Sequence, residues 1–286
     1  MIKLIKMNIY RVFHSKSTWI MLLVVIGFAL FSGYMEKEDF NMQKEAYEKG
    51  EYQESEEGEE QVEMGISVST PFNEKWVDGS KVRVLEFICA DISSGIMLIM
   101  VTIFAVLFVH AEDSSGFVKN IAGQVKRRWM LYLSKTIIVM AFTFFSLLLY
   151  SFIQGIVLMA TLDNVALGTE IFGDTVKFVL AQWFMYSAFA SGLILAVTVI
   201  RSTAISITWG ELSALGFGSI IAGFINKLID NKDFNISDYF LTDNIKALSW
   251  DSAQSDFIDA LVLALIFFAV YNLIGMIWVN KRDVNV

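Results

Sequence analysis

Six long apolar runs divide this 286-residue chain, and they leave its charged residues in separate blocks. Hydrophobic residues make up 55% of the sequence and charged residues 18%, whereas a soluble domain carries about 45–50% and about 25%. A helix that crosses a bilayer needs about 20 mostly apolar residues. We therefore expect an all-α polytopic membrane protein that forms a single transmembrane domain over residues 1–286. The six predicted spans are Thr18–Met35, Asp91–His110, Trp129–Met159, Val176–Ile200, Thr203–Asn226 and Ile258–Asn280.

The basic residues in the short connecting segments predict the orientation of these spans. They lie before the first span, between the second and third, after the fourth and after the sixth. Short segments rich in Lys and Arg stay on the cytoplasmic side of a membrane, and six spans put all four segments on that one side. We expect a multi-pass protein of the bacterial cytoplasmic (plasma) membrane with both termini in the cytoplasm.

The remaining connections, 36–83, 160–175 and 227–257, are predicted to lie outside the cell. The first holds 12 acidic residues and three lysines between Glu36 and Glu63. Such a charge run is typical of a solvated segment. A second interpretation, in which its field attracts or releases cationic peptides, stays open.

Residues 1–17, before the first span, have an amphipathic pattern. Ile5, Ile9 and Phe13 recur at helical spacing, and Lys6 and Arg11 occupy other positions. This pattern predicts a helix that lies in the inner membrane interface. The alternative is a basic anchor that only sets the topology.

The cytoplasmic segment 111–128 is longer than a turn between two spans needs. Ser114 and Ser115 can cap a helix, and the residues that follow alternate apolar and polar groups over about two turns. We expect a short amphipathic helix here. Residues around it and before the first span are predicted to anchor the chain at the membrane interface: Arg11, Arg127, Arg128, Trp129 and Lys135.

The order and spacing of several residues in this region resemble the segment after the second span of type-2 ABC exporter permeases. The matching positions are Glu112, Gly116, Lys119–Asn120, Arg128 and Ser134–Lys135. The overall plan is also similar to that family, and in particular to bacterial exporters of peptides, bacteriocins and toxins. The chain departs from the pattern in one respect, because it reads "GQVKR" where many members carry a proline before the arginine.

The resemblance implies a coupling helix that docks in a groove on a separate ATPase subunit. It assigns this coupling role to Glu112, Ser114, Ser115, Gly116, Phe117, Val118, Lys119 and Asn120. It also implies two ATPase copies and a second permease copy, as a homodimer or a heterodimer, with no nucleic-acid partner. The phosphate-binding pattern GxxxxGK[ST] is absent from the sequence. We therefore expect no cofactor on this chain, with ATP and Mg²⁺ on the partner ATPase.

Polar residues within the apolar runs are further candidates for function. Glu211 is the acid predicted to lie deepest in the bilayer, where a charge is costly and usually faces protein or water. Ala214, Gly218 and Ala222 share its helical face and would allow close helix packing. Two interpretations stay open: a substrate path, or a helix interface with a buried structural acid. Asp91 is expected to be water-exposed at the outer end of its span.

Three further polar residues within the runs are expected to form hydrogen bonds between helices rather than to bind substrate: Gln154, Gln182 and Asn272.

Catalytic and metal chemistry are not expected. Cys89 is the only cysteine, and the two histidines, His14 and His110, are far apart in the sequence. An intramembrane enzyme needs converging catalytic groups within its spans, and the apolar runs offer one deep acid. We therefore expect a transport subunit for an amphipathic peptide, toxin or other hydrophobic compound. The alternative is an immunity or sensor protein that acts without ATP.

Overall fold

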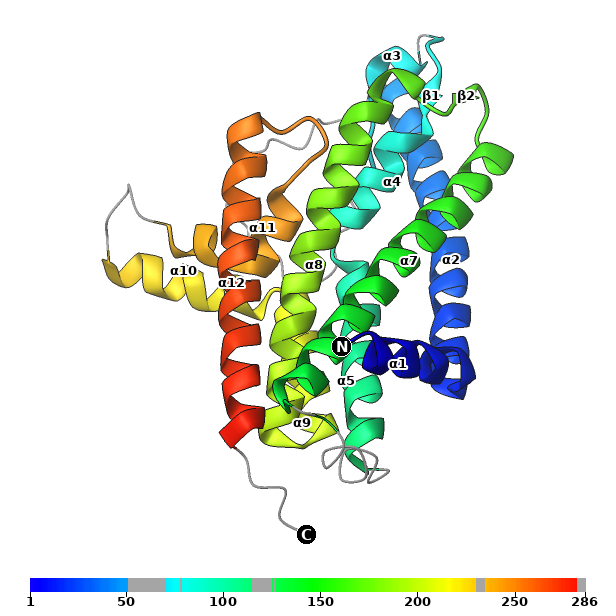
Figure 1. Cartoon of the computed structure of the whole chain (residues 1–286). Helices are drawn as coiled ribbons and strands as arrows, with labels where there is room; N and C mark the ends of the chain where they lie inside the picture. Colours follow the sequence, from blue (N-terminus) through cyan, green and yellow to red (C-terminus); the bar gives the residue numbers. More distant parts are fainter. Residues whose placement is uncertain (51–69, 78, 115–124, 126, 230–234, 282–286) are drawn as a thin grey trace.

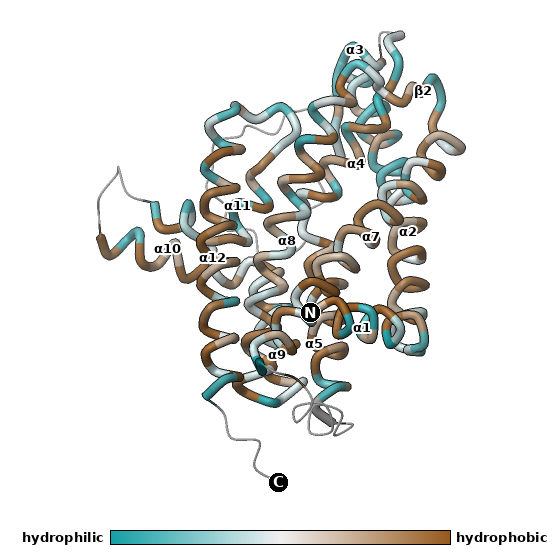
Figure 2. The backbone as a smooth tube through the Cα atoms, viewed as in Figure 1, coloured by the Kyte–Doolittle hydropathy of each residue, from teal (hydrophilic) through white to brown (hydrophobic). Residues whose placement is uncertain are grey.

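The computed structural model describes residues 1–50, 70–77, 79–114, 125, 127–229 and 235–281, and these form a bundle of long helices (Figure 1). Within this part of the chain, four helices are long and apolar enough to cross a membrane, or up to six spans if each of two bent pairs counts as one. Figure 2 shows hydrophobic residues along most of their length. The chain is thus an all-α protein with the architecture of a polytopic membrane protein. The four helices are α2 (Lys16–Glu48), α7 (Trp129–Thr161), α8 (Phe172–Ile200) and α12 (Gln254–Lys281).

The two bent pairs correspond to the predicted second and fifth spans. Helices α4 (Val84–Ser93) and α5 (Ile96–Ser114) meet at 53°. Gly95 at this break has φ 85°, a left-handed conformation that glycine adopts without a Cβ clash. We expected one continuous helix over Asp91–His110, and the structure instead has a break at Gly95.

The second bent pair also has a glycine with a left-handed backbone conformation at its break. Helices α9 (Thr203–Ala214) and α10 (Phe217–Ile229) meet at 62°, and Gly216 between them has φ 88°. In Figure 1, α10 projects sideways from the bundle. The predicted continuous span Thr203–Asn226 is therefore two helices in the structure.

Helix α1 (Ile2–His14) runs crosswise to the long helices where α2 begins, next to α2 and α7 (Figure 1). Ser15 follows it with an extended backbone, φ −81° and ψ 124°, which turns the chain into α2. Leu4 and Asn8 on one side of α1 are buried. The helix predicted for residues 1–17 is confirmed, and its position in the membrane interface stays a prediction.

Helix α2 continues to Glu48, beyond its predicted end at Met35. Glu36 and Phe40, which we assigned to the solvated loop 36–83, are buried at 1% and 5% exposure. The first part of that predicted loop is therefore a packed helix. Two short elements follow in the described residues, α3 (Glu74–Val77) and β1 (Val82–Arg83). Strand β1 pairs in parallel with β2 (Val165–Ala166), which lies in the connection between α7 and α8.

Helix α8 is the centre of the bundle and packs on α5, α7 and α12. In the most apolar 18-residue stretch of Thr169–Ile200, which includes α8, 67% is buried inside the protein, against 22% in the corresponding stretch of α12. The apolar side chains of α12 that remain exposed suit a bilayer, because hydrocarbon solvates them as a protein core would. The remaining described elements are short: the 3-10 turns η1 (Thr169–Ile171) and η2 (Ile236–Tyr239), and α11 (Leu241–Ala247).

Candidate functional site

Glu112 lies near the end of α5, where the predicted coupling segment begins. Its Oε2 is 2.7 Å from Nζ of Lys135 on α7, and its Oε1 pairs with the guanidinium of Arg11 on α1. The side chains of Glu112 and Lys135 are only 4% and 8% exposed. A buried carboxylate needs such partners, because an isolated one would cost several kcal/mol to remove from water. We call this cluster of Arg11, Glu112 and Lys135 the Glu112 junction.

Neighbouring contacts hold the Glu112 junction in place. Asn8 donates from Nδ2 to Oγ of Ser134, 3.1 Å away, and Arg11 donates from Nη1 to Oδ1 of Asn8 at 3.3 Å. The Arg11 guanidinium also lies over the ring of Phe108, 5.4 Å from its centroid, in cation–π geometry. Helices α1, α5 and α7 are therefore joined at the base of the predicted coupling segment.

The structure thus brings together residues that the sequence pattern treated separately. Lys135, which we expected to be an interface anchor, has its side chain buried against Glu112, and its role at the membrane interface stays a prediction. Arg127 is exposed, and the backbone N–H of Trp129 donates to Oδ1 of Asn280 at the end of α12, 3.1 Å away. Ser114 is the last residue of α5.

The other residues assigned to ATPase coupling, 115–120, lie outside the described residues. Their role stays a prediction.

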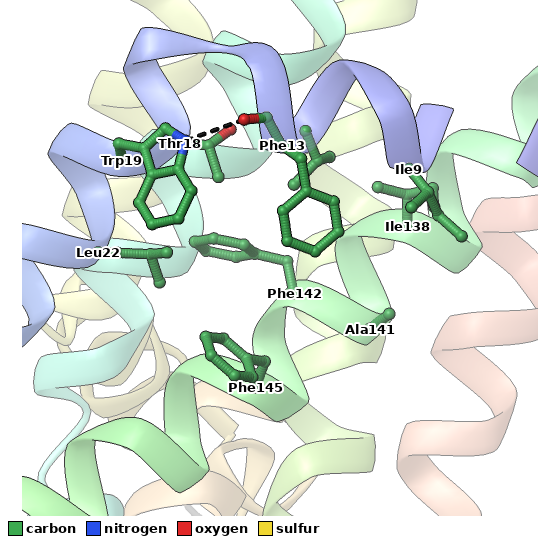
Figure 3. A pocket seen from close by; sticks show the side chains of 10 residues that line it. Ile9, Phe13, Thr18, Trp19, Leu22, Ile138, Ala141, Phe142 and Phe145 are labelled. Atoms are coloured by element: carbon green, nitrogen blue, oxygen red, sulfur yellow. Dashed lines mark hydrogen bonds between the residues drawn. The ribbon is translucent and has the colours of Figure 1, made fainter. Parts of the chain in front are cut away.

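An apolar cavity of about 260 Å³ lies between α1, α2 and α7 (Figure 3). Figure 3 shows Phe13 and Trp19 on one side of it and Phe142 and Phe145 of α7 on the other, with the Trp19 indole N–H donating to the Phe13 carbonyl oxygen at 2.9 Å. Among the described residues that line it, Thr18 alone carries a hydroxyl group. This chemistry suits a hydrocarbon group and offers no charged partner.

A second polar cluster is buried between α2, α4 and α7. We call it the inner carboxyl cluster, and it consists of Ser32, Glu36, Asp91, Tyr150 and Gln154. Oδ2 of Asp91 accepts hydrogen bonds from the hydroxyls of Ser32 and Tyr150, the latter at 2.6 Å. The amide nitrogen of Gln154 donates to Oδ2 of Asp91 and to Oε2 of Glu36, each 2.7 Å away. Two carboxyl groups therefore share one amide donor.

Aromatic side chains lie next to the inner carboxyl cluster. Phe40 is four residues beyond Glu36 on α2, and Phe87 is four residues before Asp91 on α4, so each lies about one helical turn away. The Phe87 ring is 6.0 Å from Phe40 and 5.8 Å from Trp76 of α3, between ring centroids. All three rings are buried.

Asp91 is the clearest correction to the sequence interpretation. We expected it to be water-exposed at the end of a span, and it is 0% exposed. Ser32 of α2 and Tyr150 and Gln154 of α7 bond to its carboxyl group. The extension of α2 past Met35 adds Glu36, which shares the Gln154 amide with Asp91. A signal in the sequence was the Ser32–Glu36 spacing, which puts both side chains on one helical face. The prediction of Gln154 as a link between helices is confirmed.

Glu211 and the small residues near it do not form one continuous face. Glu211 and Ala214 lie on α9, whereas Gly218 and Ala222 lie on α10, beyond the bend at Gly216. Ala214 and Ala222 are buried, while Glu211 is half-buried and its Oε1 has no hydrogen-bond partner among the described residues. The predicted single stripe is therefore divided by the bend. The role of Glu211 in a substrate path stays a prediction.

Helix α10 is held to α11 by a hydrogen bond from the Ser219 hydroxyl to Oδ1 of Asp243, 2.8 Å long. Burial raises the pKa of the Asp243 carboxyl above its ordinary value, and the hydrogen bonds from Ser219 and Thr242 oppose that rise.

Two amide side chains link other helices as predicted. Gln182 donates to the Ile245 carbonyl oxygen at 2.9 Å, and Asn272 accepts from Thr136 at 2.9 Å.

Across the described residues, no group of three or more His, Cys, Asp and Glu side chains is arranged to hold a metal ion. The two polar clusters differ in charge. The Glu112 junction pairs one acid with two bases, whereas the inner carboxyl cluster holds two acids and no base.

Comparison with protein-family models and with curated proteins finds no match for this chain.

Proposed function

We propose that this chain is the membrane-spanning permease subunit of an ATP-driven exporter of the type-2 ABC class. The observation that carries the proposal is the spaced pattern from Glu112 to Lys135, two members of which pair at 2.7 Å. The ion pair between Glu112 and Lys135 supports the resemblance, because two charged residues of the sequence pattern also contact each other in the fold.

The geometry of the Glu112 junction supports a mechanical role for the segment that follows it. A motor protein that pushes on residues 115–120 needs a rigid connection to the spans. The ion pairs of Glu112 join α5 to α1 and α7 two residues before Ser114, the last residue of α5. Movement of the segment would thus be transmitted to three helices at once.

The proposed partners follow from the same class of transporter. Two ATPase copies would bind ATP and Mg²⁺, and a second permease copy would complete the path. The proposed substrate is an amphipathic peptide, toxin or other hydrophobic compound. The apolar cavity between α1, α2 and α7 supports this class, because its lining offers contacts to hydrocarbon and none to a charged group.

The test is purification of the tagged full-length chain from its native membrane, followed by assay of the purified sample for ATP hydrolysis. The proposal expects an ATPase to co-purify and Phe117→Ala to weaken its recovery. Truncation of a well-packed interface aromatic costs about 2 kcal/mol, which corresponds to a roughly thirty-fold loss of affinity.

Phe152→Ala is the matched control, because Phe152 is 66% exposed on α7 and far in sequence from the coupling segment. It should leave ATPase recovery unchanged, and both variants should melt like the wild type. Recovery of no ATP-hydrolysing partner would favour the immunity or sensor alternative. Equal ATPase recovery with both variants would remove Phe117 from the docking region.

A further inference from the structure

The inner carboxyl cluster contains more acceptors than donors. Oε1 of Glu36, Oδ1 of Asp91 and Oε1 of Gln154 are buried and have no hydrogen-bond partner in the described part of the chain. Glu36, Asp91 and Gln154 are 1%, 0% and 0% exposed. A buried polar atom without a partner has lost its hydrogen bonds to water without replacement, so three in one cluster indicate a missing positive charge or proton.

The charged and titratable groups around Glu36 offer no compensating base within the described ranges. Asp91 faces it from α4, Asp39 lies on its own helix, and the hydroxyls of Tyr150 and Tyr186 lie on α7 and α8. Two bases that are close in sequence to the cluster have acidic partners of their own: Lys37 pairs with Glu38, and Arg83 pairs with Glu86 and Glu170. Two ionised carboxylates in this position would repel each other in a medium of low dielectric.

The donors are shared unequally between the two carboxyl groups. Asp91 accepts from Ser32, Tyr150 and Gln154, whereas Glu36 accepts, among the side chains that the structure describes, from Gln154 alone. Hydrogen bonds to a carboxylate favour its charged form. Asp91 is therefore the better carboxylate of the two, and Glu36 is the better acid.

We propose that the inner carboxyl cluster is a proton-binding site in which Glu36 carries one proton beside an ionised Asp91. A proton on Oε1 of Glu36 turns that atom into a donor for Oε1 of Gln154, while Oε2 of Glu36 still accepts from the Gln154 amide. The acid and the amide then form a cyclic pair with two hydrogen bonds. One proton thus provides partners for two of the three unpaired atoms and removes one negative charge.

The proposal gives the proton a structural consequence. Glu36 is on α2, Asp91 on α4 and Gln154 on α7, so the proton holds three helices together. Its release would leave two carboxylates side by side and would loosen α2 at that end. Ionisable groups inside membrane helices commonly serve as proton sites. The inference does not depend on the proposed export function.

Infrared spectroscopy of the full-length protein in lipid nanodiscs tests where the proton lies. The wild type at neutral pH should show the carbonyl absorption of protonated carboxyl groups, and Glu36→Gln should lose the component that Glu36 contributes. Glu38→Gln is the matched control, because Glu38 is on the same helix with a 44% exposed side chain, and it should keep the full absorption. Absence of the absorption from the wild type, or its persistence at full intensity in Glu36→Gln, would overturn the proposal.

Thermal melting against pH gives a second readout. A group that keeps its proton in the folded protein and loses it in the unfolded chain makes stability fall as the pH rises. The wild type and Glu38→Gln should show this fall above the ordinary titration range of a glutamate, and Glu36→Gln should lose it. A wild-type fall that Glu36→Gln retains would contradict the assignment.

Two further measurements distinguish a bound proton from a bound sodium ion, and Glu36 from Asp91 as the residue that carries the proton. Replacement of Na⁺ by choline at constant ionic strength should leave the wild-type melt unchanged. A lower melting temperature in choline that Glu36→Gln abolishes would identify a sodium site and overturn the proton assignment. If Glu36→Gln does not fold, isotope labelling of the wild type decides: ¹³C at the glutamate carboxyl groups should shift the protonated band, and a shift with ¹³C-labelled aspartate alone would place the proton on Asp91 instead.

Discussion

At the scale of single residues, the carboxylate of Glu112 is buried between two cations from distant parts of the sequence. Loss of one partner from a buried ion pair costs about 3–5 kcal/mol, because the remaining charge stays buried without compensation. Glu112→Gln should therefore lower the melting temperature of the chain strongly. Glu45→Gln is the control, because its pair with Lys49 is exposed and is worth about 0.3–0.5 kcal/mol.

The Glu112→Gln prediction has an internal check. Lys135→Met in the same chain removes one of the two uncompensated cations and should restore part of the lost stability. A double variant that melts no higher than Glu112→Gln would show that Lys135 is stable without its partner. Equal melting of Glu112→Gln and Glu45→Gln would show that the junction does not stabilise the fold.

A second residue-scale prediction compares two acids. Asp91→Ala leaves the hydroxyl donors of Ser32 and Tyr150 without their shared acceptor, and each orphaned donor costs about 1–3 kcal/mol. Gln154 keeps its bond to Glu36. Glu211 is half-buried and its Oε1 has no partner in the described residues. Asp91→Ala should therefore lower the melting temperature in nanodiscs more than Glu211→Ala does. A larger effect of Glu211→Ala would give that residue a structural role the observed contacts do not provide.

At the scale of helices, close approach depends on a few glycines. A Cβ added at Gly275 of α12 would lie 2.1 Å from Cζ of Tyr132 on α7, whereas one added at Gly27 of α2 would meet nothing within 4 Å. Tyr132 is 1% exposed and has little room to move. Gly275→Ala should therefore push α12 away from α7 at an overpacking cost of about 1–3 kcal/mol.

Gly27→Ala is the matched control for this prediction. The substitution has open space and improves helix propensity by up to about 1 kcal/mol, so it should not lower the melting temperature. The comparison is made by thermal unfolding of both variants in the same nanodiscs. Equal melting temperatures would mean that α12 and α7 adjust to the extra methyl group without loss of packing.

At the scale of the whole molecule, the proposed function requires a second polypeptide as the source of energy. The purified chain by itself should release no phosphate from ATP, because its sequence lacks the phosphate-binding pattern of such enzymes. Addition of the co-purifying ATPase in liposomes should restore hydrolysis. Phosphate release that persists at constant specific activity through further purification of the chain would contradict the two-component arrangement.

The sequence by itself determined the helical, membrane-like architecture. A segment in hydrocarbon satisfies its backbone hydrogen bonds in a helix or in a closed barrel, and a barrel strand needs only about 9–11 residues, so a long apolar run such as Trp129–Met159 indicates a helix. The same local logic predicted the amphipathic helix α1 and the interhelical bonds of Gln154, Gln182 and Asn272. Each of these conclusions depends on periodicity or on the cost of an unpaired polar group, and neither requires knowledge of neighbours.

Only the tertiary structure decided which polar groups meet. Arg11 and Glu112 are 101 residues apart in the sequence, and Gln154 is 118 residues from Glu36. A local pattern assigns a charged residue near the end of a span to water, as it did for Asp91, because it contains no information on which helix packs there. The bends at Gly95 and Gly216 were missed for a related reason: a glycine within an apolar run fits both a continuous helix and a break, and the packing around it selects one.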